Sequence, residues 1–313
     1  MRVPAELAET LVVVLDEGSM DAAARRLHIT PSAVSQRIKA LEEQIGRVLL
    51  VRAKPVRATA AAHSVIRFAR QLRLLEHDAI AALEDVDRIG MPLAVNADSL
   101  STWMLAPLAR VSERRPVVFD LHRDDQDFTA GLLESGTVMA AVTSRETPVA
   151  GCRASALGAL RYEAVAARSF RDRWFAGGVD VDALARAPVI DFDHRDELQS
   201  RWLRGWGVTD GPPRHRVPAS HDFAVGVRLG LGWALLPTLQ STAALRSGEL
   251  VRLGGAVIDV PLFWQQWNLR SELLDDVAHE VITHARRTLG AGVSGADPQR
   301  SRSTSKPVVP TGS

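Results

Sequence analysis

Residues 19–46 predict two short helices joined by a tight turn, and this arrangement constrains the fold more than any other feature of the chain. The first helix, Met20–Leu27, contains three consecutive alanines, and such small side chains allow a second helix to approach closely. Thr30 followed by Pro31 is typical of a helix start, because threonine caps free N–H groups and proline needs none at the first position. Gly46 ends this second helix. The pattern predicts a helix-turn-helix.

The neighbouring segments complete a small basic domain. Residues 4–16 have the apolar spacing of an amphipathic helix, and residues 47–59 alternate apolar and basic side chains, as a two-stranded wing does. Between Ser19 and Thr59, eight Lys and Arg side chains oppose three acidic ones, although the net charge of the whole 313-residue chain is only +1. A local basic surface within a nearly neutral protein is suited to binding DNA.

The exposed face of the second helix and the wing offer side chains that can contact DNA. Glutamine can pair with adenine, and serine can contact several base edges or a phosphate. Basic residues in the wing suit phosphates, which position a protein without reading sequence. The predicted DNA-binding residues are Ser19, Thr30, Ser32, Ser35, Gln36, Arg37, Lys39, Arg52, Lys54 and Arg57.

Residues 60–88 predict one long helix whose apolar side chains are spaced alternately by three and four. This pattern is typical of a coiled-coil seam, and it extends over about three heptads. A helix that packs on the core of its own domain is the alternative. We favour the seam and therefore expect a dimer. The seam residues are Val65, Phe68, Leu72, Leu75, Ala79, Ala82 and Val86.

The rest of the chain predicts an α/β domain. Gly90-Met91-Pro92 predicts a hinge, after which strands alternate with helices of 10–15 residues. After about Leu289 the composition predicts a disordered tail. The expected organisation is a DNA-binding domain at 1–59, a linker helix at 60–89, an effector domain at 90–289 and a tail at 290–313. The predicted strands are Leu93–Asn96, Val117–His122, Met139–Thr143, Val189–Asp191, Trp233–Leu236 and Leu262–Trp267.

Polar side chains follow the first two of these strands, and ligands of open α/β sheets bind beyond the carboxyl ends of strands. Residues 96–103 lead into a helix whose N-terminal hydroxyl and N–H groups suit a carboxylate, with simple helix capping as the alternative. Residues 123–127 carry three carboxylates that suit a cation, with a solvated acidic loop as the alternative. Together they predict a basic amino acid as effector. The candidate effector-binding residues are Asn96, Asp98, Ser99, Ser101, Thr102, Trp103, Asp124, Asp125 and Asp127, and, as weaker candidates, Thr143, Ser144, Asp193, Asp196, His221 and Asp222.

The sequence offers little support for catalysis or for a membrane protein. It has no Gly-x-Ser-x-Gly, Walker or His-Glu-x-x-His motif, and its single cysteine, Cys152, allows neither a CxxC zinc site nor an intrachain disulfide. We therefore expect no enzyme, metal or cofactor. The apolar runs are shorter than the roughly 20 residues of a transmembrane helix, and the first nine residues do not resemble a signal peptide. We expect a cytoplasmic protein that does not bind membranes.

The stretch LDEGSMDAAARRLHITPSAVSQRIKALEEQIGRVLLVR resembles the N-terminal signature of LysR-type transcriptional regulators, although Met20 stands where that family usually has an aromatic residue. GLGWALLP at 230–237 resembles a late effector-domain motif of the same family. The resemblance covers about the first 289 residues. It implies a periplasmic-binding-protein-like effector domain of two lobes, and dimers that commonly pair into tetramers.

Two further stretches, NADSLSTW at 96–103 and RDDQD at 123–127, resemble the ArgP/LysG branch of that family. This resemblance implies a regulator that senses lysine or arginine and controls transcription of an exporter of basic amino acids. The expected partners are promoter DNA, the effector, RNA polymerase and a second copy of the chain, as a homodimer or a homotetramer. The alternatives are a ligand-independent architectural or replication-inhibiting DNA-binding protein, and an enzyme of the binding-protein fold.

Overall fold

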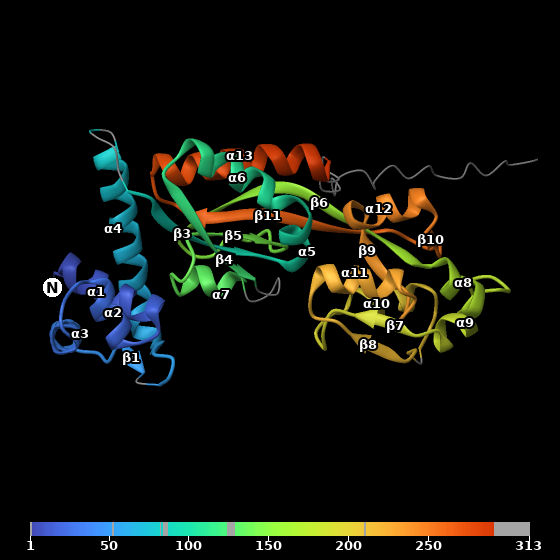
Figure 1. Cartoon of the computed structure of the whole chain (residues 1–313), viewed down its shortest axis with the longest axis horizontal. Helices are drawn as coiled ribbons and strands as arrows, with labels where there is room; N and C mark the ends of the chain where they lie inside the picture. Colours follow the sequence, from blue (N-terminus) through green and yellow to red (C-terminus); the bar gives the residue numbers. More distant parts are fainter. Residues whose placement is uncertain are drawn as a thin grey trace, which may run out of the picture.

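The computed structural model describes residues 2–51, 53–81, 83, 87–123, 129–209 and 211–290. A helical N-terminal head lies at one end, and the long helix α4 connects it to a body of two lobes (Figure 1). The structure confirms the predicted fold class of an N-terminal helix-turn-helix followed by an α/β domain. No helix in the described ranges is long and apolar enough to cross a membrane.

The head contains the predicted helix-turn-helix. It consists of α1 (Ala5–Glu17), α2 (Met20–Arg26) and α3 (Pro31–Ile45), followed by the antiparallel wing strands β1 (Leu50–Val51) and β2 (Arg57–Ala58). Ser19 and Thr30 cap α2 and α3 as expected, and Gly18 and Gly46 adopt the left-handed conformation that ends α1 and α3. The core of the head includes Ala8, Leu11, Val14, Ala23, Val34, Ile38, Leu41 and Leu49.

The linker helix is shorter than the predicted 60–88. A 3₁₀ turn at Ala60–Ala62 precedes α4 (His63–Ala81), and beyond Ala81 the described Leu83 lies in a turn with 86% of its surface exposed. The prediction extended the helix beyond Ala81 because an apolar period does not by itself indicate where a helix ends. Ala82 and Val86 of the predicted seam lie outside the described residues.

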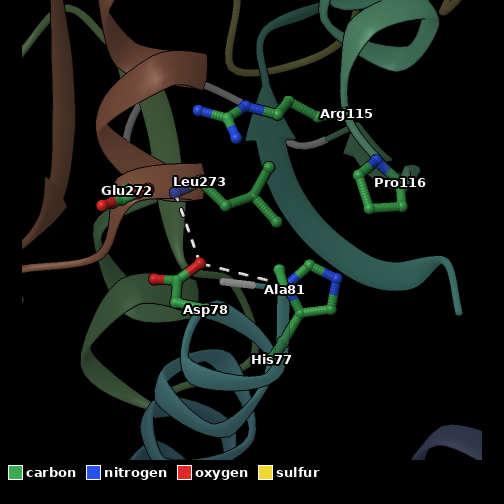
Figure 2. Close-up of a pocket in the computed structure, with 7 residues that line it drawn as sticks. All are labelled: His77, Asp78, Ala81, Arg115, Pro116, Glu272 and Leu273. Atoms are coloured by element: carbon green, nitrogen blue, oxygen red, sulfur yellow. Dashed lines mark hydrogen bonds and ion pairs between the residues drawn. The ribbon is translucent and has the colours of Figure 1, made fainter. Parts of the chain in front are cut away.

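Two faces of α4 differ in exposure. Val65, with Ile66 and Ala69, packs into the core of the head, whereas Phe68 and Leu75 are each 40% exposed. At the far end, Asp78 Oδ1 accepts a hydrogen bond from the backbone N–H of Leu273, 3.4 Å away (Figure 2). A cavity of about 60 Å³ at this junction is lined by His77, Asp78, Ala81, Arg115, Pro116, Glu272 and Leu273.

The predicted hinge at Gly90-Met91-Pro92 is wrong, because these residues lie inside β3 (Ile89–Val95). Met91 is completely buried, so the segment packs as core. Pro92 is tolerated because β3 pairs with β5 (Ala140–Thr143) only at Leu93 and Ala94, so the missing N–H removes no bond from that ladder.

Within the described residues, one sheet extends through both lobes in the order β10 (Leu250–Arg252), β6 (Cys152–Ala167), β11 (Ile258–Trp267), β5, β3 and β4 (Val117–Arg123), with β9 (Ala234–Pro237) also paired to β6. β3 is parallel to β4 and β5, whereas β11 is antiparallel to both β5 and β6. All the predicted strands occur: Val189–Asp191 has the predicted bounds, and each of the others is shifted at one end or both. β6 was missed because its many alanines show no clear alternation, yet it and β11 connect the lobes (Figure 1).

The first lobe contains β3–β5 and the helices that cover them. After β3, the chain forms α5 (Ala97–Ser99), a π-helical turn (Leu100–Met104) and α6 (Leu105–Arg114) without a break. The other helices of this lobe are α7 (Thr129–Glu134) and α13 (Glu272–Leu289). Ion pairs from Arg110 and Arg114 to Glu280 tie α13 to α6.

The second lobe is built around its own apolar cluster, which includes Val165, Ile190, Phe223, Val227, Leu236 and Leu250. It contains α8 (Arg168–Trp174), α9 (Val181–Arg186), β7 (Val189–Asp191), α10 (Leu198–Gly205), β8 (Arg214–Arg216), α11 (Ser220–Arg228), β9 (Ala234–Pro237), α12 (Thr238–Ser247) and β10 (Leu250–Arg252). The polar residues at the N-termini of α11 and α12 face the first lobe across the sites described next.

Candidate functional site

The helix α3 presents the predicted base-reading residues to solvent. Ser32, Ser35, Gln36 and Lys39 are exposed, while Val34, Ile38 and Leu41 point into the head. Lys54 and Arg57 are exposed in the wing, and Arg52 lies outside the described residues. This placement leaves the hydrogen-bonding groups of α3 available to a DNA groove, so the contact assignments stay predictions.

Five predicted DNA-binding residues have side-chain partners inside the head, among them Ser32, whose hydroxyl lies 2.9 Å from that of Thr30, and Lys39, which pairs with Glu43 at 3.6 Å. The hydroxyls of Ser19 and Thr30 each accept a hydrogen bond from the third residue beyond, at 3.2 Å. Arg37 points toward α1, where it pairs with Glu6 and lies 3.4 Å from the Thr10 hydroxyl. A contact from Arg37 to DNA would therefore require it to leave or share the Glu6 carboxylate.

Between the lobes, the structure gathers polar side chains around the Asp98 carboxyl group. The hydroxyls of Tyr162 and Ser220 each donate to Asp98 at 2.6 Å. Gln240 Nε2 donates to the hydroxyls of Ser101 and Ser220 at 3.0 and 2.9 Å, and these two hydroxyls are 2.9 Å apart. Asp98 and Ser101 come from the first lobe, Ser220 and Gln240 from the second, and Tyr162 from the connecting strand β6, so this cluster joins the lobes.

The electrostatics of the cluster favour a cationic ligand. Burial raises the pKa of the Asp98 carboxyl, the hydrogen bonds from Ser220 and Tyr162 oppose this rise, and the charge of Asp196 adds to it. Burial and the carboxylates of Asp98 and Asp196 also raise the pKa of the Tyr162 phenol well above its ordinary value. Among the described residues, the side chains that donate to the Asp98 carboxyl are the hydroxyl groups of Tyr162 and Ser220. A half-buried carboxyl with this surrounding would be stabilised in its charged form by an ammonium or guanidinium group.

The other predicted residues after β3 are less available than their sequence pattern indicates. Asn96, Ser99 and Trp103 are almost completely buried, because the helix continues without a break from α5 into α6 and turns them toward the core. The Thr102 hydroxyl donates back to the Asp98 carbonyl at 2.5 Å. In the part of the chain that the structure describes, Asn96 Oδ1, Ser99 Oγ and Trp103 Nε1 are buried without a hydrogen-bond partner.

The weaker candidates have varied roles. The Thr143 hydroxyl accepts from the Arg145 N–H at 3.1 Å, and Asp193 accepts from the Arg195 N–H at 2.7 Å. Asp196 accepts from the backbone of Phe192 and Leu198. Ser144 is partly exposed, and His221 and Asp222 are exposed beside Ser220. Asp124, Asp125 and Asp127 lie outside the described residues.

Sequence reasoning missed Tyr162, Ser220 and Gln240. Tyr162 is the single tyrosine of the chain, but the strand that carries it was not predicted. Ser220 directly precedes the predicted candidate His221. The sequence therefore indicated the correct segment, but it indicated the exposed His221 and not the buried Ser220. No group of three or more His, Cys, Asp or Glu residues that could hold a metal occurs among the described residues.

Comparisons with known proteins agree with this architecture. Residues 6–63 match the bacterial regulatory helix-turn-helix protein family, lysR type, and residues 88–286 match the LysR substrate binding domain. The chain is 42% identical over 286 residues to the lysine export transcriptional regulatory protein LysG of Corynebacterium efficiens, covering 90% of this chain and 97% of that protein.

Two solved structures are also similar. ArgP from Mycobacterium tuberculosis is 40% identical, with a TM-score of 0.81 over 93% of this chain and 99% of that one. Full-length LysG from Corynebacterium glutamicum with bound effector Arg is 37% identical, with a TM-score of 0.71 over 91% and 98% of the two chains. With both of its domains matched and relatives of this identity along most of its length, the chain belongs to the LysR family of bacterial helix-turn-helix transcriptional regulators.

Proposed function

We propose that this LysR-family regulator binds lysine or arginine between its two lobes and, in response, controls transcription of an amino-acid exporter gene. The observation that carries the choice of effector is the Asp98 carboxyl, which is enclosed by both lobes and bonded to hydroxyls. Charged groups in such surroundings need a partner of opposite charge, and a free basic amino acid brings two cationic groups.

A second carboxylate supports a basic rather than a neutral amino acid. Asp196 of the second lobe is close enough to raise the pKa of Asp98, so an effector between the lobes meets negative charge from both sides. One carboxylate can hold the α-ammonium group and the other the side-chain cation. An acidic effector would be repelled by the same groups, by more than about 1 kcal/mol if water is excluded.

The relatives support the same effector class. One similar regulator is named for lysine export, and a similar full-length structure holds arginine as its effector. We infer that this chain acts on an exporter gene in the same way, with RNA polymerase as the partner at the promoter. The DNA-binding part of the proposal rests on the exposed residues of α3 and of the wing.

We also propose that α4 forms the dimer interface. Its free face carries Phe68 and Leu75, which are seven residues apart and each 40% exposed, and these apolar side chains would be buried against a second α4. Pairing of such dimers would give a homotetramer. Sedimentation of Leu75→Glu beside Glu76→Gln, an exposed neighbour, tests this interface: the first variant should dissociate and the second should not.

Calorimetry with lysine, arginine, leucine and glutamate tests the effector assignment. Lysine and arginine should bind, and leucine and glutamate should bind at least about tenfold more weakly, which corresponds to 1.4 kcal/mol. Leucine or glutamate binding as tightly as the basic pair would refute the effector class. Binding of arginine with no change in DNA affinity or transcription would instead favour the ligand-independent architectural role.

A further inference from the structure

The linker helix α4 contacts the first lobe of its own chain through the side chain of Arg67. Its guanidinium donates to the carbonyls of Leu133 and Glu134, each at 3.1 Å, and to the carbonyl of Ala150 at 3.3 Å. Leu133 and Glu134 are the last residues of α7, where the helix dipole favours a cation; the Leu133 carbonyl also accepts a hydrogen bond from the Gly136 N–H at 3.2 Å. Arg67 therefore caps α7 from another element.

Gly136 lets the two backbones meet at this point. A Cβ atom at position 136 would lie 2.9 Å from the backbone nitrogen of Arg67 and 3.1 Å from its Cα atom, and Gly136 has a φ of +75°. Any side chain at this position would have to displace α4 or the 135–137 segment, because backbone atoms cannot rotate away as a side chain does.

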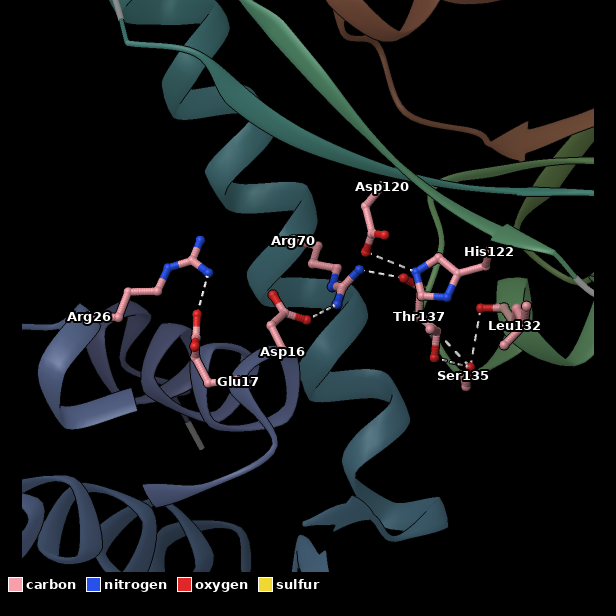
Figure 3. Close-up of polar contacts among 9 residues, drawn as sticks. All are labelled: Asp16, Glu17, Arg26, Arg70, Asp120, His122, Leu132, Ser135 and Thr137. Atoms are coloured by element: carbon pink, nitrogen blue, oxygen red, sulfur yellow. Dashed lines mark hydrogen bonds and ion pairs between the residues drawn. The ribbon is translucent and has the colours of Figure 1, made fainter. Parts of the chain in front are cut away.

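Arg70, one turn further along α4, joins the head to the same segment (Figure 3). Its guanidinium lies 2.5 Å from the Asp16 carboxylate of α1 and also donates to the Thr137 carbonyl. The residue is only 8% exposed, so its charge depends on these partners. Burial lowers the pKa of Arg70, while the charges of Asp16 and Asp120 oppose this. The Arg70 side chain thus links α4, which carries it, to α1 of the head and to the first lobe.

The segment that receives both arginines leads directly into the core of the first lobe. The Met139 N–H donates to the Pro92 carbonyl of β3, and β5 then runs from Ala140 to Thr143 beside β3. The opposite ends of these two strands carry Asp98 and Thr143 of the candidate effector site. Four buried residues of strand span only about 13 Å, so a shift at one end reaches the other through close-packed core.

We propose that Arg67, Arg70 and Gly136 form the junction through which the first lobe sets the position of the DNA-binding head in response to the effector. This inference rests on the proposed function, because it requires an effector that binds between the lobes. The effector can act at a distance only if the two positions of the head differ in effector affinity, and the coupling is then reciprocal. Arg67, Arg70 and Gly136 are positioning residues, since none of them belongs to the effector cluster.

The test uses the full chain and two ligands, arginine and the tightest duplex selected by this protein from a random DNA library. The quantity measured is the ratio of the DNA dissociation constants with and without saturating arginine. We expect a ratio of about 5 to 150 in either direction for the unaltered protein, a common range for allosteric coupling. Arg67→Ala and Gly136→Ala should each bring the ratio close to one, while arginine still binds to the DNA-free protein.

Arg286→Ala is the matched control, because Arg286 also donates to a backbone carbonyl, that of Ala156, but does not contact α4. Its ratio should equal that of the unaltered protein. If Gly136→Ala does not fold, Arg67→Ala decides, since two of its three bonds, to the carbonyls of Glu134 and Ala150, are exposed and these carbonyls can be hydrated. Unchanged ratios in the folded variants would overturn the junction alone, with effector binding intact. Failure of arginine and lysine to bind the unaltered protein would overturn the proposed function and the junction together.

Discussion

The DNA-binding head and the interlobe cluster are built in opposite ways. In the head, the caps and stops lie within a few residues of the helices they define, as Ser19 does with Ala22 and Thr30 with Ala33. In the interlobe cluster, the hydrogen bonds of Asp98 to Tyr162 and Ser220 join residues 64 and 122 positions apart. A local site can be predicted from sequence pattern, whereas a site assembled from two lobes depends on the topology of the sheet.

The largest expected effect is a loss of arginine binding when the charge of Asp98 in the interlobe cluster is removed. Asp98→Asn keeps the shape of the side chain but removes its charge, so the cation of the effector loses its buried partner. Breaking a buried ion pair costs about 3–5 kcal/mol, and arginine affinity should fall at least about 100-fold in calorimetry. Asp182→Asn removes an exposed carboxylate of the second lobe and serves as the control. Normal arginine affinity in Asp98→Asn would show that the cluster is structural only.

The second effect concerns the head. The double variant Ser35→Ala, Gln36→Ala should lose discrimination among DNA sequences by about 1–3 kcal/mol, because the exposed groups of α3 can no longer bond base edges. Arg57→Ala in the wing is the contrast: it should weaken binding to all duplexes alike and reduce the salt dependence by about one phosphate contact. Selection of bound sequences measures both. An unchanged sequence preference in the double variant would remove α3 from the reading surface.

The same contrast between local and long-range contacts explains which parts of the structure could be predicted from the sequence. The boundaries of α2 and α3 were predicted closely because capping residues and glycine define them locally. The hinge at 90–92 was wrong because glycine and proline can also occur in a buried strand where one ladder bond is absent. Asp98 and Ser101 were identified from their place after β3, but Gln240 was not, since 139 residues separate it from Ser101.

The smallest expected effect is a pH dependence of the arginine affinity, which tests whether Asp98 binds the cation. Burial raises the pKa of Asp98 in the free protein, and a bound cation would lower it again. Arginine binding should then release protons, and its affinity should rise with pH by at most about tenfold per unit, up to the pKa of the free protein. Calorimetry in two buffers of different ionisation enthalpy measures the released protons. Affinity that falls as pH rises would contradict this sign, and Asp98→Asn should show no release.

The most direct measurement is a crystal structure of the full chain with arginine. The central claim is that Asp98, held by both lobes, binds a cationic group of the effector. The account predicts an arginine nitrogen within hydrogen-bond distance of the Asp98 carboxylate, with Ser220 and Gln240 beside the ligand. Arginine bound elsewhere, with the bonds from Tyr162 and Ser220 to Asp98 unchanged and no ligand at that carboxylate, would contradict it.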